Sequence, residues 1–297
     1  MTHQNVAVVL SFFAPVPYEL PVRHFHAVLH TLHAQGIPLV VTQAVYPGGE
    51  AEYVPSCIPQ AAYDTKSFLF HKERLWNLAA GLTDADKLIF LDADVVFGAS
   101  DWLTQCVSCL DRFDIIQPYT RARWLDYSGR PDMERPPFTE AISKNLPPKF
   151  KTYHPGFGWG MTRRAFDLIG GFYDLSVCGN SDSLFALSLR DNELQAPIVK
   201  WFGDVQDPSI MCQSYKDYKK NASGLNLKVG LPKGVTLTHL WHGDRGNRNY
   251  VNRGKLFPRK PNSEYPCHTA STGLLEWDDL TTNDLVHKYF VEKKDDG

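Results

Sequence analysis

The chain has 297 residues, about twice the ~150 of a typical single domain, so one large α/β domain or two small ones fit equally well, and either can bury a sizeable core. Hydrophobic residues make up 43% of it and charged residues 22%, with 21 Gly and 20 Pro, which excludes a coiled coil, a collagen and a wholly disordered protein. The longest uncharged apolar run near the start, 6–16, is well short of the ~20 residues that a membrane helix needs. The first residues lack the positive charge of a secretory signal, so we expect a cytoplasmic protein without a membrane span.

Six cysteines lie far apart, which favours reduced, buried thiols over the disulfide framework of a small secreted domain. Cys106 and Cys109 form a C-x-x-C, but no second pair completes a zinc site. We therefore interpret the pair as two half-buried thiols on one face of a helix.

The net charge of −2 conceals a basic segment over 216–260, which has eleven Lys or Arg against two Asp and is thus +9. Tyr, Trp and Phe interleave with these basic residues, as expected of a surface that holds phosphates and stacks on rings. The alternative is an ordinary solvated basic face.

The first elements in the chain predict a parallel sheet. Residues 6–13 form a continuous apolar run, typical of a strand buried on both faces. Val22, Phe25, Leu29 and Leu32 repeat at helical spacing, and 37–41 reads as a second buried strand. Strand, helix and strand form a βαβ unit. A Gly/Pro-rich loop over 46–60 and a helix over 72–80 are expected next.

Asp92 and Asp94 lie within an apolar stretch, 87–97, that is otherwise a core strand. Two carboxylates two residues apart point to the same side of an extended strand, and burying them unpaired would cost several kcal/mol. The end of a central parallel strand is also the ligand crevice of an open α/β sheet. The alternative is an aspartate pair bonded to backbone amides where a strand meets a loop.

Residues 126–155 carry six prolines among charges and aromatics, which indicates a long surface excursion facing the substrate. In 156–171, glycines would let the backbone approach a ligand before a helix begins. A capped amphipathic helix is expected over 283–292.

Four features follow in a fixed order: the helix over 72–80, D-A-D at 92–94, G-W-G with G-G-F within 158–172, and Asp182 after Gly179. This order resembles the metal-dependent GT-A glycosyltransferases, most closely the galactosyltransferase type, over nearly the whole chain. The resemblance implies a Rossmann-like α/β fold, with a mostly parallel central sheet flanked by helices. It also implies one domain with a nucleotide-sugar-binding half (1–125), an acceptor and metal-site half (126–256), and a C-terminal loop and helix (257–297).

The resemblance implies a metal site of Asp94, His239 and His242, in which H-x-x-H replaces the family's M-x-x-H. This mixed oxygen and nitrogen set favours Mn²⁺, with Mg²⁺ as the alternative. Asp182 would be the general base of an inverting reaction, in a motif where G-N-S-D replaces G-x-E-D and loses the acceptor-binding glutamate. The implied donor-binding residues are Ser11, Gln43, Lys72, Asn77, Asp92, Gly158, Trp159, Gly160, Arg245 and Arg248.

Three of these motifs also have an alternative, purely structural interpretation. Asp182 could cap a helix, Trp159 could be a core residue, and H-x-x-H alone could be two surface histidines with ordinary hydrogen-bond partners.

Asp92 would reach the donor's ribose or share the ion, and Arg245 and Arg248 would pair with the donor's diphosphate.

The expected donor is a nucleoside diphosphate sugar, with UDP as the default from the resemblance. Late in the chain, H-x-W-H-G at 239–243 and N-R-x-Y-x-x-R at 247–253 resemble bacterial and bacteriophage glycosyltransferases, some of which decorate DNA bases. With the basic segment, this resemblance implies a hydroxymethylated pyrimidine in duplex or single-stranded DNA as acceptor. A cell-surface glycan or lipid-linked saccharide is the competing acceptor.

Two other classes of protein are alternatives to a glycosyltransferase. A sugar-nucleotide pyrophosphorylase would need a Gly-rich phosphate loop near residues 11–15, where this chain reads S-F-F-A-P. A non-catalytic nucleic-acid or glycan-binding protein would not need D-A-D, Asp182 and H-x-x-H together.

Overall fold

The computed structural model describes residues 5–147, 149–177, 179–190, 212–248, 260 and 264–297. Its strands are β1 (Val6–Phe13), β2 (Leu39–Val45), β3 (Gln60–Asp64), β4 (Lys87–Leu91), β5 (Val95–Phe97), β6 (Ile115–Ile116), β7 (Arg121–Leu125), β8 (Pro131–Arg135), β9 (Gly158–Thr162), β10 (Val229–Gly230), β11 (Thr236–His239), β12 (Cys267–Thr269) and β13 (Leu275–Trp277). Its helices are α1 (Glu19–Ala34), α2 (Lys72–Ala80), α3 (Trp102–Leu110), α4 (Phe138–Ser143), α5 (Arg163–Ile169), α6 (Ser181–Ser188), α8 (Gln213–Gly224) and α10 (Leu280–Glu292), with a 3₁₀ turn η3 at Arg245–Arg248.

Within the described part of the chain, the central sheet has seven strands in the order β10-β6-β9-β4-β1-β2-β3. Only β9 runs antiparallel to its neighbours, so the predicted α/β class with a mostly parallel central sheet is confirmed. Adjacent parallel strands such as β1 and β2 are joined through α1, as the βαβ pattern predicted.

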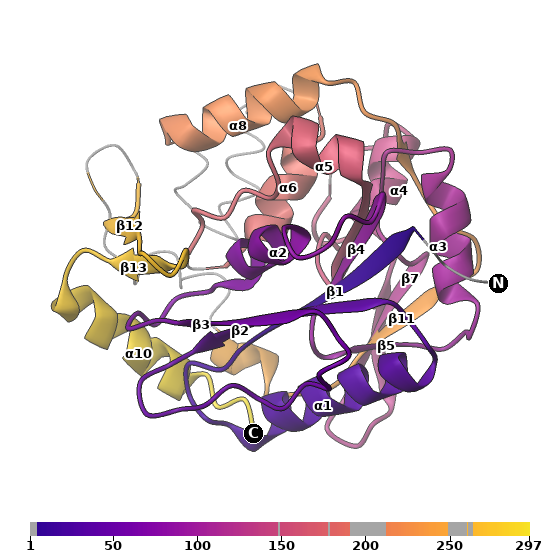
Figure 1. The fold of residues 1–297 in the computed structure, drawn as a ribbon. Coiled ribbons are helices and arrows are strands. Elements are labelled where there is room, and N and C mark those ends of the chain that lie inside the picture. The colour runs from indigo at the N-terminus through magenta and orange to yellow at the C-terminus, as the bar shows by residue number, and fades with distance from the viewer. Residues whose placement is uncertain (1–4, 148, 178, 191–211, 249–259, 261–263) are drawn as a thin grey trace.

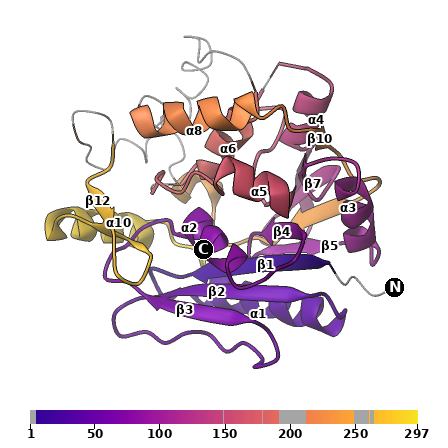
Figure 2. The same cartoon turned by 45° about the horizontal axis from the view of Figure 1, so that its top comes forward.

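Helices cover both faces of this sheet (Figures 1 and 2). Along β1, Val6, Val8 and Leu10 pack with side chains of α1 and α3. The alternating Ala7 and Val9 pack on the opposite face, with side chains of α2, α5, α6 and α8. Because successive residues of a strand point to opposite faces, a strand covered on both sides must be apolar throughout, as this run is.

The chain changes sheets at the D-A-D. Strand β4 ends at Leu91 in the central sheet, and β5 begins at Val95 in a second sheet of order β5-β11-β7-β8. The prediction of a single strand over 87–97 is therefore wrong: a turn carries both aspartates between two strands. Such a turn leaves both side chains at the carboxyl end of β4 without placing them inside a core strand.

Residues 126–155 contain more regular structure than the prolines indicated. Strands β7 and β8 form an antiparallel hairpin, and α4 follows, with Phe138 and Ala141 fully buried. Pro131, Pro136 and Pro137 stand at the ends of β8 and α4, where their missing N–H is tolerated. The expectation of a long surface excursion is thus wrong for this part, although Arg135, Phe150 and His154 do face the cavity described below.

The last described elements are a β12–β13 hairpin and α10. Helix α10 begins before the predicted range 283–292, and its N-cap is Asp279, whose side chain accepts a hydrogen bond from Thr282 N. Cys106 and Cys109 are buried thiols on α3. Among the described residues, no helix is both long and apolar enough to cross a bilayer. The predicted division into parts at 125 and 256 remains a prediction.

Candidate active site

A cavity of about 420 Å³ lies where β1 and β4 end. Its lining comes from many elements: the β1–α1 loop, the start of α2, the D-A-D turn, residues 154–157, the start of α6, the β11 end, and residues 293 and 295. This is the crevice outside the carboxyl ends of parallel strands, where α/β proteins bind ligands.

Asp94, His239 and His242 meet on one side of this cavity. Asp94 Oδ2 lies 2.8 Å from His242 Nε2 and 3.5 Å from His239 Nε2, and one ligand atom from each residue lies within 4.8 Å of the others. The backbone explains the convergence, because β11 pairs antiparallel with β5 so that His239 lies opposite Val95, and Leu240 N donates to Asp94 O at 2.9 Å.

The donor atoms of this cluster fit a divalent cation. Asp94 Oδ1 is buried and has no hydrogen-bond partner among the described residues, as expected of an atom awaiting another ligand. One carboxylate with two imidazoles is a donor set that suits Mn²⁺. Burial alone raises the pKa of Asp94, but the adjacent His239 and His242 hold it well below its usual range.

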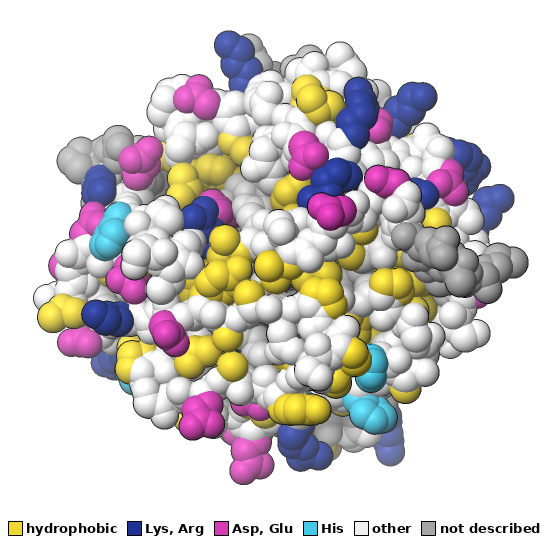
Figure 3. Space-filling model, viewed as in Figure 1, with side chains coloured by type: hydrophobic (Ala, Val, Ile, Leu, Met, Phe, Trp, Pro, Cys, Tyr) yellow, Lys and Arg dark blue, Asp and Glu magenta, His cyan; other side chains and the backbone are white. Residues whose placement is uncertain are grey.

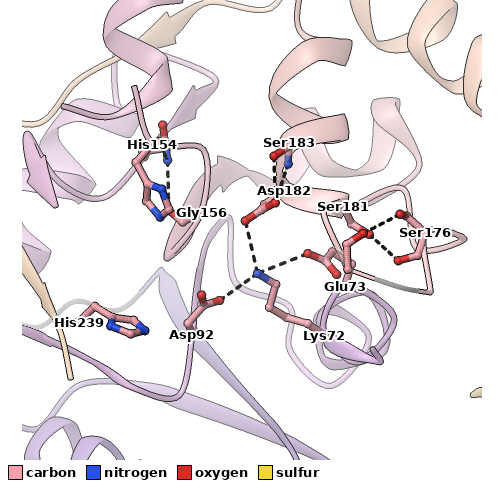
Figure 4. A network of polar contacts seen from close by, with 12 residues as sticks. Lys72, Glu73, Asp92, His154, Gly156, Ser176, Ser181, Asp182, Ser183 and His239 are labelled. Carbon is pink, nitrogen blue, oxygen red and sulfur yellow. Dashed lines mark hydrogen bonds and ion pairs between the residues drawn. The ribbon is translucent and has the colours of Figure 1, made fainter. Parts of the chain in front are cut away.

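On the other side of the cavity, Lys72 joins three carboxylates (Figure 4). Its Nζ lies 3.2 Å from Asp92 Oδ1, 3.5 Å from Glu73 Oε1 and 3.9 Å from Asp182 Oδ2. Burial raises the pKa of Asp92 to about 6 and that of Glu73 to about 7, and Lys72 opposes both shifts. The ammonium therefore offsets a buried excess of negative charge.

Asp182 lies in the first turn of α6, where Oδ1 accepts a hydrogen bond from Ser183 N at 2.7 Å. Its other oxygen is held over Gly156, since a Cβ at that glycine would stand 2.5 Å from Asp182 Oδ2 and 3.0 Å from His154 Nε2. Gly156 thus keeps space clear beside Asp182. The N-cap of α6 is Asn180, not Asp182, so capping does not account for this aspartate.

Ser11 lines the cavity, and its hydroxyl is hydrogen-bonded to Thr42 Oγ1 at 2.8 Å. Five other residues that the resemblance implied for the donor lie away from the cavity lining: Gln43, Asn77, Gly158, Trp159 and Gly160. Gln43 instead bonds the backbone of Glu52, and Asn77 bonds the backbone N and O of Phe172.

The G-W-G segment lies in the core. Trp159 is fully buried and meets Phe185 edge-on, with ring centroids 4.8 Å apart. A Cβ at Gly158 would stand 2.7 Å from Phe90 O, and one at Gly160 would stand 2.8 Å from Ile116 Cγ1. These two glycines thus permit close contact between strands, not close approach of a ligand.

The backbone of Arg245 and Arg248 is described as η3, but their side chains lie outside what the structure describes, so their contact with the donor remains a prediction. Part of the basic segment is internal: Lys219 is buried on α8. The molecular face that includes α8 carries Lys and Arg interspersed with Asp and Glu (Figure 3).

Among the cavity residues that the sequence analysis did not identify are Glu73, His154, Lys293 and Asp295. Glu73 adjoins Lys72 in a predicted helix, so its acidic side chain at a helix start was a usable signal. Burial lowers the pKa of His154 well below its usual range, so a neutral imidazole lies near Asp182. Nothing in the order of residues brings 293–295 to the cavity.

No protein family model matches the chain, and no curated protein matches its sequence. Among solved structures it is similar to S. aureus TarS in complex with UDP-GlcNAc, at 14% identity and a TM-score of 0.40, over 62% of this chain and 52% of that one. It is similar to mannosyltransferase PcManGT from Pyrobaculum calidifontis in complex with GDP-Man and Mn²⁺, at 16% identity and a TM-score of 0.38, over 62% and 51%.

A mutant of Drosophila β-1,4-galactosyltransferase 7, in complex with manganese, UDP-Gal and xylobiose, is similar at 10% identity and a TM-score of 0.42, over 95% of this chain and 98% of that one. The chain spans about half the length of the TarS and mannosyltransferase chains.

Proposed function

We propose that this chain is a metal-dependent glycosyltransferase, which moves a sugar from a nucleoside diphosphate sugar to a hydroxyl acceptor. The observation that carries the proposal is the meeting of Asp94, His239 and His242 at one cavity that Asp182 also lines. A cation ligand set and a separate carboxylate in one crevice meet the two needs of this reaction, which are stabilising a leaving diphosphate and removing a proton.

Asp94, His239 and His242 would hold Mn²⁺, which when bound stabilises the negative charge that develops on the leaving diphosphate. Asp182 Oδ2 would accept the proton of the acceptor hydroxyl as that oxygen attacks the anomeric carbon from the face opposite the diphosphate. This geometry inverts the configuration. Lys72, at 3.2 Å from Asp92 and 3.9 Å from Asp182, holds these two carboxylates in place.

For the acceptor we propose a hydroxymethylated pyrimidine in DNA, with a cell-surface glycan or lipid-linked saccharide as the alternative. The support is the excess of Lys and Arg over 216–260 in the sequence. UDP is the nucleotide proposed for the donor.

The test is slow donor hydrolysis. The protein is incubated with a panel of nucleoside diphosphate sugars and Mn²⁺, with and without EDTA. We expect at least one donor to release its nucleoside diphosphate only when Mn²⁺ is present, and the variants H239A and H242A to release none. If no donor is cleaved in any combination, or cleavage is unaffected by EDTA, the proposed function is wrong.

The acceptor is tested by adding hydroxymethylcytosine DNA, with the same DNA carrying unmodified cytosine as the matched control. Sugar transfer to the first alone, at a rate that falls with added salt, supports the DNA acceptor. Transfer to glycan or lipid-linked acceptors instead supports the alternative. Formation of nucleoside triphosphate from donor and added pyrophosphate would identify a pyrophosphorylase.

A further inference from the structure

Residues 293–296 lie against the proposed metal site, although they are more than fifty positions from His242. Asp295 Oδ1 lies 3.3 Å from His242 Nδ1, and His242 Nε2 lies 2.8 Å from Asp94 Oδ2. His242 therefore turns one ring nitrogen to Asp94 and the other to a carboxylate that is itself 7% exposed. A carboxylate bonded to the far nitrogen of a ligating imidazole fixes its tautomer and ring orientation.

The carboxylate of Asp295 also forms an ion pair with a lysine. Asp295 Oδ2 lies 2.7 Å from Lys293 Nζ, and the side chain of Lys293 is only 15% exposed. The Lys293 ammonium lies over the rings of Phe70 and Phe290, at 5.9 and 6.0 Å from their centroids. Lys293, Phe70 and Phe290 all line the cavity. Asp295 thus joins a metal-site imidazole to an ammonium in the cavity wall.

Two further contacts fix this segment. Gly243 follows His242 at φ +77°, and a Cβ there would stand 2.4 Å from Lys294 O, so only glycine lets the two segments lie this close. Asp296 accepts hydrogen bonds from Glu19 N at 3.0 Å and Leu20 N at 2.8 Å, at the start of α1. The segment is therefore anchored on both sides of Asp295.

The charges on this side of the cavity suit a diphosphate. Leaving the imidazoles out of the count, the carboxylates of Asp94 and Asp295 and the ammonium of Lys293 sum to one negative formal charge, which a divalent cation would reverse. Lys72 is committed to three carboxylates on the other side. Arg135 donates to Phe150 O. Among the cavity cations with described side chains, Lys293 is the one joined through Asp295 to His242, which places its ammonium beside the proposed metal site.

We propose that Asp295 is a positioning residue that orients His242 toward the metal, and that Lys293, held by Asp295, binds the diphosphate of the donor. The inference rests on the proposed function. One short segment, 293–295, would then support both the binding of the metal ion and the binding of the donor's diphosphate. No sequence motif identifies this segment.

The first test measures Mn²⁺ binding without nucleotide, by isothermal titration and by the electron paramagnetic resonance of bound Mn²⁺. We expect D295N, which keeps the shape of the side chain, to lose about 10- to 100-fold in Mn²⁺ affinity. D284N, at an exposed position on α10, is the matched control and should bind as the unaltered chain does. Thermal unfolding is recorded for both variants, because a merely structural role would lower Tm without a selective loss of Mn²⁺ affinity.

The second test measures the binding of UDP and of GDP in saturating Mn²⁺. We expect K293M to weaken both nucleotides by about 10-fold or more, the effect of losing a charge-assisted phosphate contact, while its Mn²⁺ affinity stays within about 2-fold. K294M removes the neighbouring, exposed ammonium and is the matched control. Equal nucleotide binding by K293M and K294M would overturn the role of Lys293.

The variant G243A perturbs the contact between His242 and Asp295 from the side of His242. We expect it also to weaken Mn²⁺ binding, because the new methyl group displaces 294–295 from His242. Unchanged Mn²⁺ affinity in both D295N and G243A overturns the role of Asp295 while leaving the proposed function intact. If the unaltered chain binds no Mn²⁺, the proposed function and this inference are both wrong.

Discussion

In the proposed mechanism, Asp182 is the side chain that distinguishes transfer of a sugar from mere binding of its donor. Replacing it with Asn keeps the shape and the contact with Ser183 N but removes the proton acceptor. We expect D182N to lower kcat by about 10²- to 10⁴-fold while the donor's Kd changes by no more than about 2-fold. Steady-state kinetics with donor titration measures both, and D167N, at an exposed position on α5, is the control. A D182N variant with normal turnover would remove Asp182 from the mechanism.

Glu73 predicts a pH dependence of stability. Burial raises its pKa in the folded chain to about 7, above its value in an unfolded chain, so the folded state retains a proton that the unfolded state releases between about pH 4.5 and 7. The free energy of unfolding loses this contribution as the pH rises through that window. We expect E73Q, which does not titrate, to gain stability relative to the unaltered chain between pH 5 and 8, on the order of 1–3 kcal/mol.

Urea denaturation at the two pH values measures the gain from E73Q. E140Q is the control, since Glu140 pairs with Lys144 at the surface, where such pairs contribute little. A stability difference that does not change with pH would show that Glu73 is ionised in the folded chain throughout.

Single residues show what a sequence can predict of such a site. Asp94, His239 and His242 were found through a family resemblance, and the structure brings them together. The sequence allowed Trp159 to be either a donor-binding residue or a core residue. It lies in the core because β9 is flanked by β4 and β6 in the middle of the sheet. Asp295 carries no local signal, since its importance comes only from the packing of 293–296 against His242.

At the scale of elements, β9 depends on its glycines. A Cβ at Gly158 would stand 2.7 Å from the backbone oxygen of Phe90 and 2.9 Å from Leu91 Cδ2, and a backbone oxygen within a paired strand cannot move aside. We expect G158A to lower the free energy of unfolding by about 1–3 kcal/mol, as overpacking does. G98A is the control, because a Cβ at Gly98 meets nothing within 4 Å. Chemical denaturation compares them, and equal stability would mean that β9 can shift at no cost.

Elements were predictable where one pattern dominated. The apolar run of β1 and the helical repeat of α1 identified both. The β7–β8 hairpin and α4 were hidden by prolines that stand at their ends, and α8 by its many charges, although Tyr215, Lys219 and Ala222 recur at helical spacing on its buried side. Composition misleads where a short element buries only a narrow stripe.

At the scale of the whole molecule, the three proposed metal ligands come from segments that belong to two different sheets. Asp94 follows β4 of the central sheet, and His239 ends β11 of the second. An ion bound only by the folded state raises stability by about 2.7 kcal/mol at 100 times its Kd. We therefore expect saturating Mn²⁺ to raise Tm by several degrees, and EDTA to reverse the shift. Calorimetry measures it, with H239A as control, and a Tm that ignores Mn²⁺ would contradict the site.

The pairing of β5 with β11 has a consequence for how this chain reaches its final form. Sliding β11 by one residue would turn His239 to the opposite side of the sheet, and sliding it by two would carry the imidazole about 7 Å along the strand. Only one alignment lets a single ion contact Asp94 and both histidines. An ion bound at this site would therefore favour the native strand pairing, because misaligned forms gain nothing from its presence.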